Sequence, residues 1–211
     1  MTWRETGPIQ DDFVKVFAPL ERTQTRFSEL SIGGPTRGSS AARDGRTKVG
    51  KIAWDTALVA GSIGVDHLVA WRMLRLRGAF QPNFAHLALI RGAIEGSSVA
   101  RWLCDPDIQT TERLRRAAGA KLNDLTERGK FERRMSSRLA KPTGKGRTAE
   151  QRIVAFERLL RRRNIEPKQM PRATELFARY FPGKTAEGSE GFYRMISAVI
   201  HAKVWSVIRT Q

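Results

Sequence analysis

Two residues near the carboxyl end of the chain have side chains suited to phosphodiester chemistry. Arg194 and His201 are seven positions apart in an apolar stretch that predicts a helix over residues 189–209. Seven residues make about two helical turns, so both side chains would leave the helix on one face. A guanidinium stays charged, and an imidazole can give or take a proton near neutral pH. The pair is a candidate catalytic site, with Ser197 between its members.

The competing interpretation of this pair is structural. A histidine on an apolar helix is more often a hydrogen-bonded core residue than a catalyst, because buried polar groups need partners. Arg194 and His201 would then be packing residues.

A second polar pair lies in a largely apolar stretch that predicts a helix from Pro82 to about Asp105. Arg91 and Glu95 are four positions apart there, which places them on one helical face. They predict either a structural ion pair or a pair that orients the catalytic side chains. Both interpretations stay open at the level of sequence.

The sequence predicts no metal or nucleotide-hydrolysis motif. The only histidines are His67, His86 and His201, and no His-Glu-x-x-His pattern occurs. Asp66 and His67 are adjacent, so on a helix they point in different directions. Glycine-rich phosphate loops and the Gly-x-Ser-x-Gly turn are also missing from the sequence. We expect neither metal nor cofactor.

The composition indicates a polyanionic partner. The chain has 211 residues and a formal net charge of +17, from 38 Lys and Arg against 21 Asp and Glu. Its single cysteine, Cys104, excludes an intramolecular disulfide. No signal peptide or membrane span is expected, because the most apolar stretches carry charged residues. A cytoplasmic location fits these features best.

The positive charge is concentrated in one part of the chain. Residues 112–163 hold seventeen Lys and Arg against six Asp and Glu, a net charge of +11. This basic segment predicts contact with nucleic acid, with a solvated basic face as the alternative. Its candidate binding residues lie in or beside a glycine-rich turn or at the end of the next helix: Lys141, Lys145, Arg147, Arg161, Arg162 and Arg163.

Hydrophobic periodicity predicts an all-α protein, a single bundle of about six or seven helices. Residues 1–48 predict a helical arm, kinked or divided at Pro19, followed by a flexible Gly/Ser loop over 31–47. Residues 49–211 predict the bundle, in which Gly61 and Gly64 indicate close approach by another helix. Its helices are expected over 49–77, 82–105, 110–139, 148–163, 173–181 and 189–209, with Thr148 and Gln151 as a capping box and Ser189 as a cap.

The layout of these helices, with Arg91 and Glu95 on a middle helix and a last helix reading Tyr193 to His201, resembles the HEPN superfamily (higher eukaryotes and prokaryotes nucleotide-binding domain). It is also similar to bacterial helical proteins whose last helix ends in a Ser-x-x-x-His segment. The resemblance covers about residues 49–209. In many members, an arginine and a histidine with four to six residues between them mark a metal-independent ribonuclease. Arg194 and His201 have six residues between them, the upper limit of that range.

The resemblance implies an endoribonuclease of the toxin or antiphage-defence type, acting on RNA. It implies His201 as acid or base, Arg194 as the cation that stabilises the phosphoryl group, and a homodimer that completes the site. An antitoxin or another partner protein would be consistent with such a role. Met195 departs from the pattern, because active members commonly have a polar residue after the arginine. The alternative is a non-catalytic helical module that binds nucleic acid or a protein.

Overall fold

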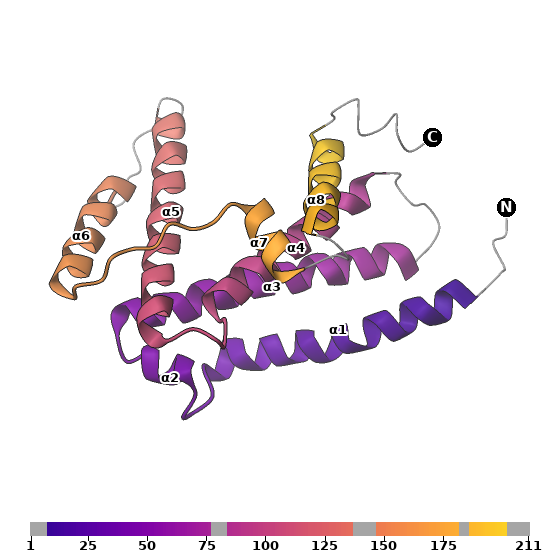
Figure 1. The fold of residues 1–211 in the computed structure, drawn as a ribbon, viewed down its shortest axis with the longest axis horizontal. Helices are drawn as coiled ribbons and strands as arrows, with labels where there is room; N and C mark the ends of the chain where they lie inside the picture. Colours follow the sequence, from indigo (N-terminus) through magenta and orange to yellow (C-terminus); the bar gives the residue numbers. More distant parts are fainter. Residues whose placement is uncertain (1–7, 77–83, 137–146, 182–185, 202–211) are drawn as a thin grey trace. The chain divides into compact units, whose positions relative to one another are not determined.

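The computed structural model describes residues 8–76, 84–136, 147–181 and 186–201 of the chain, and in these residues it is all-α without strands. The all-α prediction is confirmed, and the eight described helices are one more than the upper estimate (Figure 1). The helices are α1 (Pro8–Gly33), α2 (Ser40–Asp44), α3 (Lys48–Leu76), α4 (Ala85–Leu103), α5 (Thr110–Ser136), α6 (Ala149–Arg162), α7 (Ala173–Tyr180) and α8 (Ala186–Ile200).

The chain folds into two compact units, and each is assembled from segments distant in sequence. Unit 1 comprises residues 1–34, 58–101 and 172–211, and contains α1, most of α3 and α4, and the pair α7 and α8. Unit 2 comprises residues 35–57 and 102–171, and contains α2, the first turns of α3, and the pair α5 and α6. In each pair the two helices pack directly against each other.

Closely packed glycines hold the helices of unit 1 together. A Cβ on Gly61 would lie 2.4 Å from the Phe27 ring of α1, and one on Gly64 would lie 2.8 Å from Oγ of Ser97 on α4. From the other side, a Cβ on Gly96 would come within 2.5 Å of a backbone oxygen of α3. The close approach predicted at Gly61 and Gly64 is therefore confirmed, because no side chain larger than hydrogen fits there.

A buried apolar cluster forms the core of unit 2. Ala117 and Ala118 of α5 are fully buried, and Phe156 and Leu160 of α6 pack into the same cluster, as the helical period of α6 predicts. The capping box of α6 is also confirmed. The amide of Gln151 donates to Oγ1 of Thr148 at 3.3 Å, and the Thr148 amide donates to the Gln151 side chain at 3.1 Å.

A short helix lies where the sequence predicted a flexible loop. The Ser39 side chain accepts from the amide of Ala42 and starts α2, and Asp44 ends that helix in a buried position. Asp44 accepts from Arg113 at 2.7 Å and from Thr110 at 2.9 Å, both on α5. The loop prediction over 31–47 was wrong here because these contacts reach 66 and 69 positions along the chain.

The sequence predicted that Pro19 would kink or divide the first helix. The division does not occur, since α1 runs through Pro19 from Pro8 to Gly33, and the kink stays a prediction. Proline lacks one backbone donor, and within a long helix its neighbours retain their own bonds. The last helix begins at Ala186 and so passes through Ser189 instead of being capped by it. Its expected extension over 202–209 lies outside the described residues.

By length and composition alone, one described helix could cross a membrane. Residues Lys48–Leu74 of α3 include a window of mean hydropathy 1.2, of which 22% is buried. Core helices of soluble proteins meet the same criterion, so this finding is weak evidence for a span. The expectation of no membrane segment stays a prediction.

Candidate active site

The candidate catalytic histidine of unit 1 contacts an arginine of α4. A terminal nitrogen of Arg91 lies 3.1 Å from Nε2 of His201, directly after the last turn of α8. A guanidinium has donors only, so a hydrogen bond at this contact has Nε2 as its acceptor. His201 is exposed, and Arg91 retains 24% of its side-chain exposure. An acid–base group and a cation therefore meet where solvent reaches both.

Glu95 holds Arg91 in this position. Its Oε1 accepts from Nε of Arg91 at 2.7 Å and from the hydroxyl of Tyr193 on α8. The guanidinium carbon also lies 5.7 Å from the centre of the Tyr193 ring. One carboxylate oxygen thus ties α4 to α8, and Arg91 is fixed both by a charged hydrogen bond and by an aromatic face.

The protonation states of this network follow from its contacts. Burial opposes the charge on Arg91, yet the hydrogen bonds and charges of Glu95 and Tyr193 leave the pKa of Arg91 above its ordinary value. Burial, and then the hydrogen bond to Glu95 and its negative charge, raise the pKa of Tyr193 to about 12. Arg91 therefore stays charged and Tyr193 stays a donor at neutral pH.

Arg194 occupies a different environment. It donates to Oε1 of Glu190 through two nitrogens, at 2.9 and 2.6 Å, and its side chain is 68% exposed. Within the described residues, the structure gives it no contact with His201. Ser197 is half-buried and lies one turn before His201, whose amide donates to the Ser197 carbonyl at 3.1 Å. The structure thus brings Arg91, Glu95 and His201 together, and leaves Arg194 on the solvent side of α8.

The role of Tyr193 was not expected from the sequence, in which it was only a neighbour of Arg194. A signal was available, because a tyrosine in an apolar helix needs a partner for its hydroxyl. Tyr193 is only 4% exposed. Its partner could not be identified from the sequence, since Glu95 is 98 positions away.

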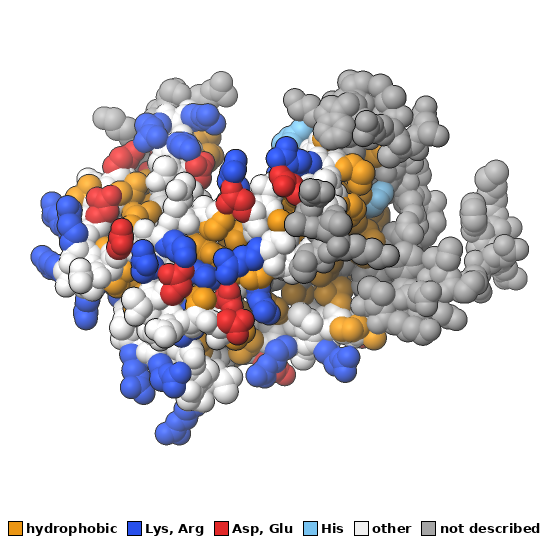
Figure 2. Space-filling view, in the orientation of Figure 1, with side chains coloured by type: hydrophobic (Ala, Val, Ile, Leu, Met, Phe, Trp, Pro, Cys, Tyr) orange, Lys and Arg blue, Asp and Glu red, His pale blue; other side chains and the backbone are white. Residues whose placement is uncertain are grey.

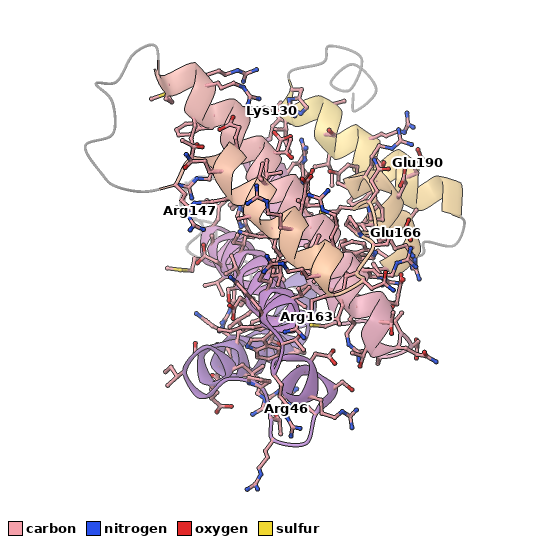
Figure 3. All side chains as sticks on the ribbon, turned by 90° about the vertical axis from the view of Figure 1, so that its left-hand side faces the viewer. Arg46, Lys130, Arg147, Arg163, Glu166 and Glu190 are labelled. Atoms are coloured by element: carbon pink, nitrogen blue, oxygen red, sulfur yellow. The ribbon has the colours of Figure 1, made fainter. Side chains whose placement is uncertain are left out.

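The basic segment of unit 2 is described in part. Lys141 and Lys145 lie outside the described residues, whereas Arg147 is exposed just before α6. Figure 3 shows Arg147 near the start of α6 and Arg163 directly after its last turn. Arg161, Arg162 and Arg163 are exposed, and no described residue forms an ion pair with their side chains. Lys and Arg side chains are prominent on the face over α5 and α6 (Figure 2).

The polar side chain of His67 on α3 packs against neighbouring backbone. Nδ1 of His67 lies 2.8 Å from the carbonyl oxygen of Ile63, one turn earlier. Its ring lies against Gly92 of α4, where a Cβ would come within 2.3 Å of it. Among the described residues, no three His, Cys, Asp or Glu side chains form a group that could hold a metal ion.

Comparisons of the chain with known protein families, curated proteins and solved structures found no match.

Proposed function

We propose that the protein is an endoribonuclease that needs no metal, as its resemblance to the HEPN superfamily implies. The observation that carries this proposal is the 3.1 Å contact between Arg91 and the exposed His201. Cleavage beside a 2′-hydroxyl requires a group that moves a proton and a cation that stabilises the phosphoryl oxygens. Both groups are present, and the cation is held in place by Glu95 and Tyr193.

In the proposed reaction, the phosphate of the scissile bond lies against Arg91. The guanidinium then donates to a phosphoryl oxygen and releases Nε2 of His201, which accepts the proton of the 2′-hydroxyl. The 2′-oxygen bonds to phosphorus, and the bond from phosphorus to the 5′-oxygen breaks. The 5′-oxygen takes a proton from water or from the imidazolium of a second copy. The products are a 2′,3′-cyclic phosphate end and a 5′-hydroxyl end.

A homodimer is part of this proposal, because the resemblance implies a site completed by two copies of the last helix. Arg194 is exposed on that helix beside Glu190 and could then act as a second cation toward RNA. A role in toxin or antiphage systems, with an antitoxin or partner protein, would follow from the same resemblance.

The test is cleavage of single-stranded RNA by the purified protein in EDTA. We expect 2′,3′-cyclic phosphate ends, and a loss of about 10²–10⁴-fold in rate for His201→Ala. Arg91→Gln should lose about 10²–10³-fold. Both variants should keep the wild-type helical content, because His201 is exposed and Arg91 is partly exposed.

Glu190→Gln is the matched control, since Glu190 lies on the same helix but contacts only Arg194 among the network residues. It should cleave at the wild-type rate. Cleavage that persists in His201→Ala would contradict the proposal, and would point to a contaminating nuclease or another site.

Non-catalytic binding of nucleic acid is the second candidate function, and the exposed arginines at the end of α6 favour it. Arg161, Arg162 and Arg163 are free to contact phosphates, and binding through them would weaken steeply with salt. This candidate predicts binding without cleavage, and a shallower salt dependence when the three arginines are replaced by glutamine. Salt-independent binding would argue against it.

A further inference from the structure

Unit 2 contains a cavity that belongs to no part of the proposed active site. Its volume is about 580 Å³, which is within the range of pockets that bind small ligands. It is lined by the start of α3, the start of α5, the end of α6 and the turn that follows α6. Figure 3 labels two of its residues, Arg163 and Glu166.

Part of the cavity lining is apolar. Val49 is 2% exposed and belongs to the core cluster of unit 2, and Leu114, Leu159 and Ile165 are half-buried against that cluster. Such walls suit a flat or aliphatic group and offer little to a bare inorganic ion.

The residues that line the cavity carry a net positive charge, and only some of their cations form ion pairs with described residues. The guanidinium of Arg115 is bound to Glu166, since it donates to the carbonyl and the carboxylate of that residue at 3.2 Å each. Lys48 and Arg163 are exposed, and no described residue pairs with either cation. Two free cations on one cavity match the charge of a phosphomonoester dianion. The amino ends of α3 and α5, at Lys48 and Thr111, add positive partial charge.

The turn after α6 gives the cavity a fixed wall. Asn164 has φ +52°, and the amide of Ile165 donates to the carbonyl of Leu160 at 3.0 Å. The amides of Arg163 and Asn164 also bond to carbonyls of the last turn, so the negative end of α6 is satisfied internally. Further along, the amide of Lys168 donates to the Arg115 carbonyl at 2.9 Å and attaches the segment to α5.

We infer that this cavity binds a nucleoside monophosphate, with the phosphate on Lys48 and Arg163 and the base between the apolar walls. The side chains of Thr111 and Asn164 also line the cavity and can bond to polar edges of a base. The inference uses only residues of unit 2, so it does not depend on RNA cleavage by His201. The same chemistry is offered by a free nucleotide and by the phosphorylated end of a strand.

The experiment is calorimetric titration of the full-length protein with adenosine 5′-monophosphate, and with adenosine as the uncharged counterpart. We expect adenosine to bind at least about tenfold more weakly, because it lacks the group that engages both cations. Lys48→Gln and Arg163→Gln should each weaken nucleotide binding about tenfold.

Arg46→Gln is the matched control, because Arg46 is exposed two positions before Lys48 but does not line the cavity. It should change the affinity less than about twofold, as expected for a screened charge. Thr111→Trp places a large ring at an exposed lining position and should abolish binding while both cations remain. Circular dichroism of each variant separates loss of the ligand from loss of the fold.

Two results would overturn the inference. One is the absence of nucleotide binding to the wild type at millimolar concentration. The other is an equal loss of affinity in Arg46→Gln and Arg163→Gln, which would show attraction to charge without a pocket. Short DNA strands with and without a 5′-phosphate distinguish the two sources of the ligand, and they lack the 2′-hydroxyl that cleavage needs. Tighter binding of the phosphorylated strand assigns the pocket to strand ends, and equal binding assigns it to free nucleotides.

Discussion

The guanidinium of Arg91 lies 3.1 Å from Nε2 of His201, although 110 positions separate the two residues in the sequence. The carboxylate of Glu95 holds this guanidinium at 2.7 Å and ties it to Tyr193 of α8. The arginine that the structure places with the histidine is thus on α4, and the arginine on the histidine's own helix is paired with Glu190.

The two arginines should therefore differ in their effect on RNA cleavage. Arg91→Gln should slow cleavage about 10²–10³-fold, because it removes the cation beside the histidine. Arg194→Gln should slow it less than about tenfold, since an exposed and paired cation contributes little. Initial rates on one RNA measure both. An equal loss in both variants would show that Arg194 acts directly on the substrate.

Tyr193 should titrate late and should make stability depend on alkaline pH. The difference in tyrosinate absorbance between the wild type and Tyr193→Phe isolates this phenol, and its midpoint should lie at about 12. Because the folded state holds the proton more tightly than the unfolded chain, the stability from this group is complete below pH 10.0. It is lost as the pH rises toward about 12. A midpoint at the ordinary value of 10.0 would contradict the hydrogen bond to Glu95.

Glu112 should contribute stability that acid removes. Burial opposes its charge, yet hydrogen bonds from Lys168 and Arg116 hold the pKa of Glu112 below its ordinary 4.5. The unfolded chain binds the proton first, so stability present above pH 4.5 is lost as the pH falls through the lower folded value. Glu112→Gln should lose about 2 kcal/mol at neutral pH and show a weaker dependence on acid.

The control for this measurement is Glu127→Gln. Glu127 pairs with Lys130 on the same helix, and both side chains are more than half exposed. Its effect on the free energy of unfolding should stay within about 0.5 kcal/mol, as for other surface ion pairs. Urea denaturation at several pH values compares the two variants. Similar losses in both would show that the Glu112 network adds no more than a surface pair.

Replacement of two glycines of α5 by alanine should change the free energy of unfolding in opposite directions. A Cβ on Gly119 would lie 1.7 Å from the carbonyl oxygen of Lys168, so Gly119→Ala must displace backbone and should cost about 1–3 kcal/mol. A Cβ on Gly129 meets its nearest neighbour at 3.4 Å, an ordinary contact. Gly129→Ala should stabilise the protein by about 0.5–1 kcal/mol, the helix preference for alanine. Thermal unfolding followed by circular dichroism checks both signs.

Several local features of the fold were predictable from the sequence. Capping and periodicity act within a few residues, which is why Thr148 and Gln151 predicted the start of α6. A glycine within a helix indicates close approach by another element, even when that element is unknown. Gly61 and Gly64 could therefore be identified as sites of close packing. The local excess of positive charge was also visible, since it is a property of composition.

Contacts between side chains that are distant in sequence depend on how the helices pack. The short helix α2 forms inside a glycine-rich stretch because its last residue, Asp44, is buried and accepts hydrogen bonds from Arg113 and Thr110. Arg91 meets His201 because α4 and α8 pack together through Glu95 and Tyr193. The packing of whole helices sets such partners. The apolar face of a helix can be recognised in the sequence, but the helix that packs against this face cannot. For that reason the residue types of the candidate site were predictable. The sequence left open whether Arg91 and Glu95 form a structural ion pair or orient the catalytic side chains, and the contact of Arg91 with His201 depends on helix packing.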